Sequence, residues 1–289
     1  MSAPMQFLRD LALLAKPRIT MMSVMVAAGA AGLAPGTPEL SSLLWALLGI
    51  GLIVGAANAW NQYLERDVDA KMNRTRQRPL PQGRLAPAVG LGFAVVTAVL
   101  ALAVLWLKGN AITALVGLLA LINYVFVYTP LKRRTSWALH VGTLSGAAPV
   151  LMGWTAMTGG FEAAGLVLFS LMVVWQLPHF LAIALFRQDE YAAAGLVVAP
   201  HEHGDDATRR VAVAYATALL PISLLLVPLH VAGWAYAAVA VVVNLMFMGM
   251  GASGVINSSG RPWARRFFAA SLVYPVGIVL AFLADLAIS

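Results

Sequence analysis

Long apolar runs recur along the chain, and short polar segments separate them. A helix needs about 20 predominantly apolar residues to cross the hydrocarbon core of a bilayer. The runs cover residues 19–34, 40–60, 85–107, 110–128, 137–158, 163–186, 211–228, 231–253 and 267–286. This pattern predicts a single all-α domain over residues 1–289, a polytopic membrane protein with nine transmembrane helices around a central cavity. The first helix is expected to begin nearer Lys16, with Pro17 in its first turn.

Composition supports the membrane interpretation and excludes some kinds of functional site. The chain is 61% hydrophobic and 11% charged, with a mean hydropathy of +0.82, which is more apolar than a soluble protein of this size requires. It has no cysteine, which excludes disulfides, thiolate metal sites and thiol nucleophiles. Because Arg9 and Asp10 interrupt the first apolar stretch, the N-terminal segment is not expected to be a cleavable signal peptide. We expect a short amphipathic lead-in at the membrane surface instead.

Basic residues are distributed unevenly between the predicted loops. With the N-terminus on the cytoplasmic side, the inner loops are 61–84, 129–136, 187–210 and 254–266. Of the 19 Lys and Arg residues, all but Lys108 then lie inside. This asymmetry satisfies the positive-inside rule and supports nine spans in a bacterial plasma (inner) membrane, with the C-terminus outside. Topology also explains the net charge of +7, so no nucleic-acid partner is expected.

An ordered polar segment follows the second apolar run. Asn61, Glu65 and Asp69 repeat every four residues, which places them on one face of a helix. Loop acids contribute little to topology, so this register favours a binding site over solvated loop charge. Oxygen ligands suit Mg²⁺, which proteins usually hold with one or two carboxylates plus substrate phosphates. Basic residues, which suit phosphate oxygens, follow in the same segment: Lys71, Arg74 and Arg78.

A histidine lies deep in the sixth apolar run, within the segment from Trp175 to Gly195. Pro178 removes a backbone donor, so it can open the helix near His179. Ionisable residues inside a membrane usually face a cavity, which favours ligand contact. The alternative is a packing histidine bonded to a neighbouring helix. Asp189 and Glu190 follow the end of the run by about one turn, on the same side of the membrane as Asp69.

A basic cluster occupies the short inner loop after the fourth run. Tyr128, Lys132 and Arg133 belong to the sequence YTPLKRRT. Their positive charges would act as topological anchors, or they would neutralise a diphosphate held by the acidic motif. The residues alone leave both interpretations open.

The acidic segment resembles the first signature of the UbiA-type intramembrane prenyltransferases. That signature is an Asn, an acid four residues later, an Asp four further on, and an Arg-Thr-x-x-Arg-Pro-Leu tail. Here it reads Asn61, Glu65 and Asp69, with RTRQRPL at 74–80. Many bacterial members have Asp where Glu65 stands, so this residue is a variant of the pattern.

Two further segments resemble signatures of the same family. GTLSGAAPVLMGWTAMTG at 142–159 is similar to a Gly- and Pro-containing stretch. WQLPHFLAIALFRQDEYAAAG at 175–195 resembles the signature that separates the haem-farnesylating branch from the quinone prenyltransferases. Leu177 and Leu181 depart from the commoner Pro and Trp at those places. The similarity covers about residues 12–285.

The resemblance implies an Mg²⁺-dependent enzyme that uses farnesyl diphosphate and haem B within the lipid bilayer and yields haem O and diphosphate. It implies that Glu65 and Asp69 hold the metal while Asn61 orients a ligand or water. Asp189 would assist from the second motif. The implied substrate contacts are Lys71, Arg74, Arg78, Tyr128, Lys132, Arg133 and His179. The expected protein partner is a second copy of the chain or a membrane protein of the haem pathway.

Two other functions are weighed against this one. A prenyltransferase for an aromatic quinone or chlorophyll-type precursor would share the acidic motif, but the Pro-His-Phe segment argues against it. A transporter with a midplane site between broken helices would show inverted repeats and charges within its spans. Here the charges gather at one predicted face of the membrane, and no repeat is evident.

Overall fold

The structure is a computed structural model that describes residues 2–36, 39–257 and 260–288. Within these residues the regular secondary structure is entirely helical. Helices suit an apolar chain because they satisfy every backbone hydrogen bond internally, as the bilayer core requires. Six helices of the described chain are long and apolar enough to cross a membrane, or up to seven if the first two helices form one bent span. The fold is therefore all-α and polytopic, while nine spans remain a prediction.

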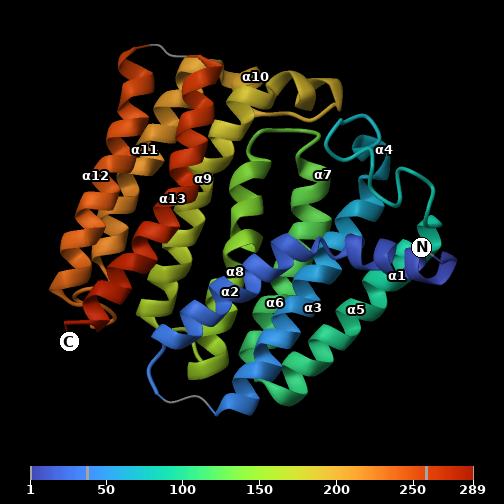
Figure 1. Cartoon of the computed structure of the whole chain (residues 1–289), viewed down its shortest axis with the longest axis horizontal. Helices are drawn as coiled ribbons and strands as arrows, with labels where there is room; N and C mark the ends of the chain where they lie inside the picture. The colour runs from blue at the N-terminus through green and yellow to red at the C-terminus, as the bar shows by residue number, and fades with distance from the viewer. Residues whose placement is uncertain (1, 37–38, 258–259, 289) are drawn as a thin grey trace. The chain divides into compact units, whose positions relative to one another are not determined.

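The contacts divide the chain into two compact units. The first contains Met1–Arg134, Ala148–Phe161 and Ala192–Leu196, and the second contains the remaining residues. The helices of the first unit are α1 (Ala3–Leu14), α2 (Pro17–Leu33), α3 (Leu40–Leu64), α4 (Arg66–Asp69), α5 (Pro87–Lys108), α6 (Ala111–Ile122), the π-helix η1 (Asn123–Tyr128) and α7 (Thr129–Leu131), together with the C-terminal half of α8 (Ala138–Thr158) (Figure 1).

Proline begins two helices of the first unit, where its missing N–H leaves no helical bond unmade. The prediction that the helix over 19–34 begins nearer Lys16, with Pro17 in its first turn, is confirmed, because α2 begins at Pro17. α3 and α5 run side by side (Figure 1) and form the most extensive helix contact of this unit. Gly49 permits their close approach, because a Cβ there would lie 2.6 Å from Leu105 Cδ2. A buried cluster beside the acidic motif joins α1, α3 and α5 to the loop after α4: Leu14, Ala59, Leu80, Leu85 and Ala94.

The second unit contains the N-terminal half of α8 and five further helices. These are α9 (Ala163–Ala193), α10 (Ala199–His203), α11 (Asp205–Leu224), α12 (Trp234–Ile256) and α13 (Arg261–Leu286). α12 packs mainly against α13 and α11. The predicted opening of the helix at Pro178 is wrong, because α9 continues through it. Gln176 Nε2 secures this turn by donating to Met172 O at 3.1 Å and to Thr143 O at 3.2 Å.

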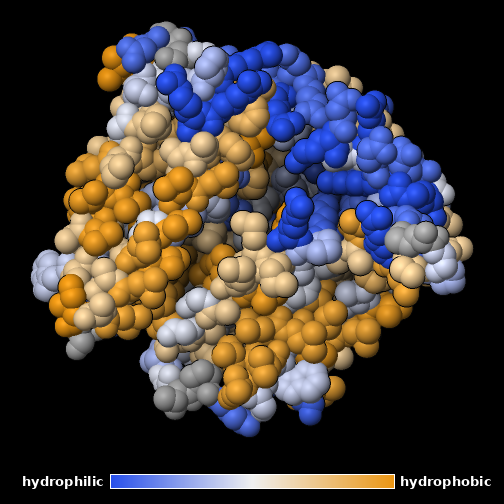
Figure 2. Space-filling model, viewed as in Figure 1, coloured by the Kyte–Doolittle hydropathy of each residue, from blue (hydrophilic) through white to orange (hydrophobic). Residues whose placement is uncertain are grey.

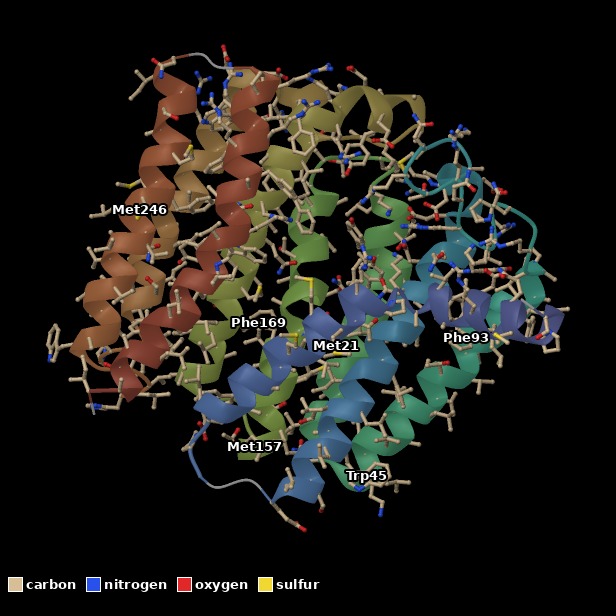
Figure 3. The ribbon with its side chains drawn as sticks, viewed as in Figure 1. Met21, Trp45, Phe93, Met157, Phe169 and Met246 are labelled. Atoms are coloured by element: carbon tan, nitrogen blue, oxygen red, sulfur yellow. The ribbon has the colours of Figure 1, made fainter. Side chains whose placement is uncertain are left out.

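Large apolar side chains cover the helix flanks of both units. In the first unit, Met21 on α2 and Trp45 on α3 are 61% and 41% exposed, and in the second, Met246 on α12 is 71% exposed (Figure 3). Figure 2 shows hydrophobic surface over the flanks of α5 and α12, whereas polar side chains gather over α4 and the loop that follows it. Apolar flanks of this extent are suited to contact with lipid.

Candidate active site

The acidic motif of the first unit spans a break between two helices. α3 ends at Leu64, Glu65 leaves helical geometry (φ −106°, ψ 11°), and α4 then ends at Asp69. The prediction of one continuous helix through the motif is therefore wrong. The four-residue relation survives because Glu65 N donates to Asn61 O at 2.9 Å and Asp69 N donates to Glu65 O at 2.7 Å. All three residues are buried, with exposed fractions of 1–4%.

Asn61 links the motif to the helix that carries the basic cluster. Its Nδ2 donates to Glu65 Oε2 at 2.8 Å and to Thr129 Oγ1 at 3.2 Å. The Thr129 hydroxyl donates in turn to Tyr124 O at 2.7 Å, so its one proton is used and it accepts from Asn61. These bonds orient the amide with Oδ1 pointing away from Glu65.

Each residue of the motif is bonded to one basic side chain, and the three basic residues come from separate segments. Lys16 Nζ, between α1 and α2, donates to Asn61 Oδ1 at 3.2 Å. Lys132 Nζ, just after α7, lies 2.6 Å from Glu65 Oε2. Arg78 Nη1, in the loop after α4, lies 2.6 Å from Asp69 Oδ2. The site therefore balances its two buried carboxylates with positive charge held at bonding distance.

Lys132 remains charged in this environment. Burial disfavours the ammonium form, but Tyr128 and the Glu65 carboxylate outweigh that effect, and together they raise the pKa of Lys132 above its ordinary value. The ammonium lies 5.0 Å from the centroid of the Tyr128 ring, within the range of a cation–π contact. Tyr128 thus contacts the basic residue that pairs with the acidic motif.

Thr75 positions Arg78. The Thr75 side chain is buried and donates to Asp69 O at 2.8 Å, and Arg78 N donates to Thr75 O at 2.9 Å. Two residues further on, Leu80 enters the buried cluster beside α5. The loop is thereby fixed at both ends of the basic segment, which explains how an irregular stretch presents its guanidinium to Asp69.

The structure separates the predicted basic residues into two groups. Arg78 and Lys132 pair with the motif, whereas Lys71, Arg74 and Arg133 are exposed. A substrate role for the exposed three stays a prediction. Sequence reasoning missed Lys16 and Thr129 as members of the site. Lys16 carries a weak signal, because it is a basic residue at the inner end of the first predicted span, but nothing in the sequence singles out Thr129.

The carboxylates present suit a magnesium ion. Glu65 Oε1 is buried without a hydrogen-bond partner in the part of the chain that the structure describes, and an unpaired buried carboxylate oxygen is suited to a cation. No group of three His, Cys, Asp or Glu side chains in the described ranges is arranged to hold a metal by itself. One or two carboxylates are the usual protein contribution to Mg²⁺ bound with water and substrate phosphates, so the residues fit the ion.

His179, in the second unit, has a defined hydrogen-bond direction. Its Nδ1 lies 2.8 Å from Ser271 Oγ, and the Ser271 hydroxyl donates to Phe268 O at 2.6 Å. Because that hydroxyl has one proton, His179 Nδ1–H must be the donor. Nε2 therefore carries the lone pair of the neutral ring. The rings of Trp175 and Phe268 lie 5.3 Å and 4.9 Å from the imidazole.

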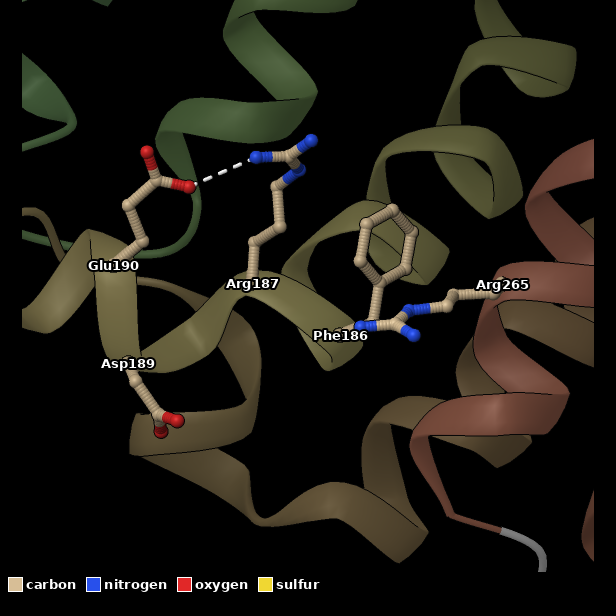
Figure 4. A pocket seen from close by; sticks show the side chains of 5 residues that line it. All are labelled: Phe186, Arg187, Asp189, Glu190 and Arg265. Carbon is tan, nitrogen blue, oxygen red and sulfur yellow. Dashed lines mark hydrogen bonds and ion pairs between the residues drawn. The ribbon is translucent and has the colours of Figure 1, made fainter. Parts of the chain in front are cut away.

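The end of α9 and the start of α13 line a pocket of about 440 Å³. Figure 4 shows Arg187 bonded to Glu190, at 2.9 Å, and Phe186 beside Arg265. Glu190 Oε1 is buried and without a partner among the described residues. Asp189, the acid predicted from the sequence, is 72% exposed and lies 2.7 Å from Arg261. The buried oxygen makes Glu190 a second acidic candidate beside Asp189, the acid that the sequence analysis preferred for the role.

Comparison with curated proteins finds relatives that match nearly the whole chain. The model of the UbiA prenyltransferase family matches residues 21–273. A protoheme IX farnesyltransferase of Myxococcus xanthus (strain DK1622) is 49% identical over 276 residues, which cover 96% of this chain and 94% of that protein. One of Anaeromyxobacter sp. (strain Fw109-5) is 48% identical over 93% of this chain and 91% of its own length.

Solved structures share the fold at low sequence identity. A digeranylgeranylglyceryl phosphate synthase aligns with a TM-score of 0.83 and 14% identity over 96% of this chain and 98% of that chain. A UbiA homologue from Archaeoglobus fulgidus, solved with DMAPP and Mg²⁺, aligns with a TM-score of 0.66 and 16% identity over 94% of this chain and 98% of that chain. With the family match over most of the sequence, these findings establish that the chain belongs to the UbiA prenyltransferase family.

Proposed function

We propose that the chain transfers the farnesyl group of farnesyl diphosphate to a vinyl group of haem B, giving haem O and diphosphate. The observation that carries the proposal is the buried acidic motif in which Asn61, Glu65 and Asp69 are each bonded to a basic side chain. Such a site offers acids to a divalent metal and cations to a diphosphate. The names of the 49% and 48% identical relatives support farnesyl as the transferred group and haem as its acceptor.

Glu65 and Asp69 are the residues that would hold Mg²⁺, and the A. fulgidus homologue solved with DMAPP and Mg²⁺ supports this choice of metal. When bound, Mg²⁺ acts as a Lewis acid that offsets the negative charge of the departing diphosphate. Lys132 and Arg78, which pair with these acids in the free protein, then turn to the phosphate oxygens. There they stabilise the charge that develops as the bond between farnesyl carbon 1 and oxygen breaks.

The remaining residues of the motif position these groups. Asn61 is fixed by Glu65 and Thr129, so its Oδ1 can orient a water or a metal ligand. Tyr128 lies against the Lys132 ammonium and guides its approach. Lys71, Arg74 and Arg133 add positive charge at the entrance for an anionic substrate. Asp189 assists from the end of α9, as the second signature implies.

His179 is the proposed haem contact. Its Nε2 lone pair is directed away from Ser271, and a neutral imidazole held in this way is a common ligand of iron. The neighbouring Trp175 and Phe268 rings provide aromatic surface for a flat macrocycle. The vinyl π electrons then form the new bond to farnesyl carbon 1. Water captures the resulting cation and loses a proton, which leaves the hydroxyl of haem O.

The finer topology belongs to the same proposal. Nine spans, a cytoplasmic N-terminus and an outer C-terminus follow from the distribution of Lys and Arg. The terminal residues themselves, Met1 and Ser289, lie outside the described residues, as do 258 and 259 of the last predicted inner loop. α8 and α11 would supply the spans beyond those identified by length and hydropathy.

Purified protein in lipid vesicles, given haem B, farnesyl diphosphate and Mg²⁺, tests the proposal. Liquid chromatography with mass detection should find a product heavier than haem B by one farnesyl group and one hydroxyl, together with released diphosphate. An aromatic quinone precursor is offered in parallel as the competing acceptor. Transfer to that precursor and not to haem would overturn the acceptor, and no transfer to either would overturn the proposed reaction.

A further inference from the structure

Lys16 reaches the motif from an unusual backbone conformation. It separates α1 from α2, and its φ of 48° and ψ of 69° lie in the left-handed region. That region is unfavourable for residues with a Cβ and persists where surrounding structure enforces it, often at functional sites. The two helices meet here with a bend of 48°. We call residues Leu13 to Lys16 the elbow.

One face of α3 holds the elbow in place. The Gln62 side chain is fully buried, and its Nε2 donates to Leu13 O at 3.2 Å and Leu14 O at 2.7 Å. These carbonyls belong to the last turn of α1, beyond the reach of its i→i−4 hydrogen bonds, and Leu13 O also accepts from Lys16 N at 3.2 Å. Asn58 Nδ2, one turn earlier on α3, donates to Ala15 O at 3.4 Å. Successive carbonyls of the elbow are thus bonded to side chains of the helix that carries Asn61.

Two further observations mark this contact as specific. Gly55 lies on the same face of α3, where a Cβ would come within 3.3 Å of the Ala15 side chain, so the elbow approaches α3 closely. Gln62 Oε1 is buried and has no partner among the described residues. An unpaired buried oxygen is unfavourable, and the two bonds donated by Gln62 Nε2 offset that cost.

We infer that Gln62 is a positioning residue for the diphosphate site, acting through Lys16. By fixing the elbow, Gln62 holds Lys16 Nζ at Asn61 Oδ1, 3.2 Å away. From there Lys16 Nζ can donate a third hydrogen bond, beside those of Lys132 and Arg78, to the diphosphate of the prenyl substrate. This inference rests on the proposed function for the identity of that substrate.

A double-mutant cycle tests the inference. Lys16→Met removes the amino group, and Gln62→Met keeps the approximate shape of the side chain but removes both donated bonds. Each single change should raise the KM for farnesyl diphosphate about tenfold, as expected for the loss of one or two hydrogen bonds, and leave the KM for haem unchanged. In the Lys16→Met background, Gln62→Met should add less than about twofold, because the group that it positions is gone.

Gln176→Met is the matched control, since Gln176 is also buried and also donates to two carbonyls, but in the second unit. It should lower the melting temperature to a similar extent without changing the KM for farnesyl diphosphate.

If Gln62→Met fails to fold, Thr20→Val replaces it, because the valine removes one bond of 2.6 Å from the Thr20 hydroxyl to Ala15 O. Provided that the wild type transfers farnesyl, two results would overturn the inference. One is that Gln62→Met raises the KM for farnesyl diphosphate equally in the wild-type and Lys16→Met backgrounds. The other is that Lys16→Met has no effect. Absence of transfer by the wild type would instead overturn the proposed function.

Discussion

Replacing Lys132 by methionine should move the affinities for metal and for diphosphate in opposite directions. Lys132 Nζ lies 2.6 Å from Glu65 Oε2, and the two side chains are 18% and 5% exposed. A hydrogen bond between charged groups contributes about 1.5–3 kcal/mol, or about 10- to 150-fold in a dissociation constant. This bond competes with Mg²⁺ for Glu65, so its removal should tighten Mg²⁺ binding measured without diphosphate. Because the change also removes a cation from the proposed diphosphate site, diphosphate should bind more weakly by a factor in the same range.

Calorimetric titration measures both affinities on the purified protein. Mg²⁺ is titrated without diphosphate, and inorganic diphosphate is titrated at saturating Mg²⁺. Lys108→Met is the matched control, because it removes the same charge from a lysine that lies over Trp45, 5.8 Å from the ring centroid, at the opposite predicted membrane face. It should change neither affinity. If Lys132→Met bound both Mg²⁺ and diphosphate more weakly, Lys132 would not compete with Mg²⁺ for Glu65 and then turn to the phosphate oxygens. Thermal unfolding must show that the variant is folded.

Three further predictions concern the metal ligands, the haem contact and the membrane orientation. Asp69→Asn should reduce Mg²⁺-dependent turnover by roughly 10²-fold, since metal-borne charge stabilisation is worth several kcal/mol. Asp67→Asn, at an exposed residue of the same short helix, should be nearly silent, and equal losses in the two variants would contradict the assignment. His179→Ala should weaken haem binding or shift the Soret band, and Ser271→Ala should do so in part by releasing the imidazole; an unchanged spectrum with lower stability would favour a packing role. A thiol probe on a cysteine placed at Glu162 should react from outside the cell, and reaction only after permeabilisation would reject the predicted orientation.

The helices and part of the candidate site could be predicted from the sequence alone. Every predicted apolar run overlaps a helix in the described chain, because membrane helices are selected by length and hydropathy, which are local properties. The four-residue spacing located three buried polar residues that are hydrogen-bonded along the chain. Arg78 follows soon after the motif, so a search for nearby phosphate ligands was enough to find it.

Other features depend on contacts between distant parts of the chain. Lys16 lies 45 residues from Asn61 in sequence, and no local pattern specifies that pairing. Pro178 was expected to open α9, but bonds from Gln176, one of them to Thr143 on α8, hold the turn together. The helix break at Glu65 also escaped prediction, because the residue is compatible with a helix and its carboxylate is instead engaged by Lys132.

The π-helix η1 sets the rotational phase of the residues that follow it. An α-helix advances about 100° per residue, whereas a π turn accommodates an extra residue before the hydrogen bonding resumes. Thr129 and Lys132 both follow η1, and they are the residues that meet Asn61 and Glu65. A homologue lacking one residue between 123 and 128 would present a different side chain to the acidic motif, even with an otherwise identical sequence. Single-residue gaps in this segment therefore change the composition of the site, and alignments of relatives need their register assigned there from structure.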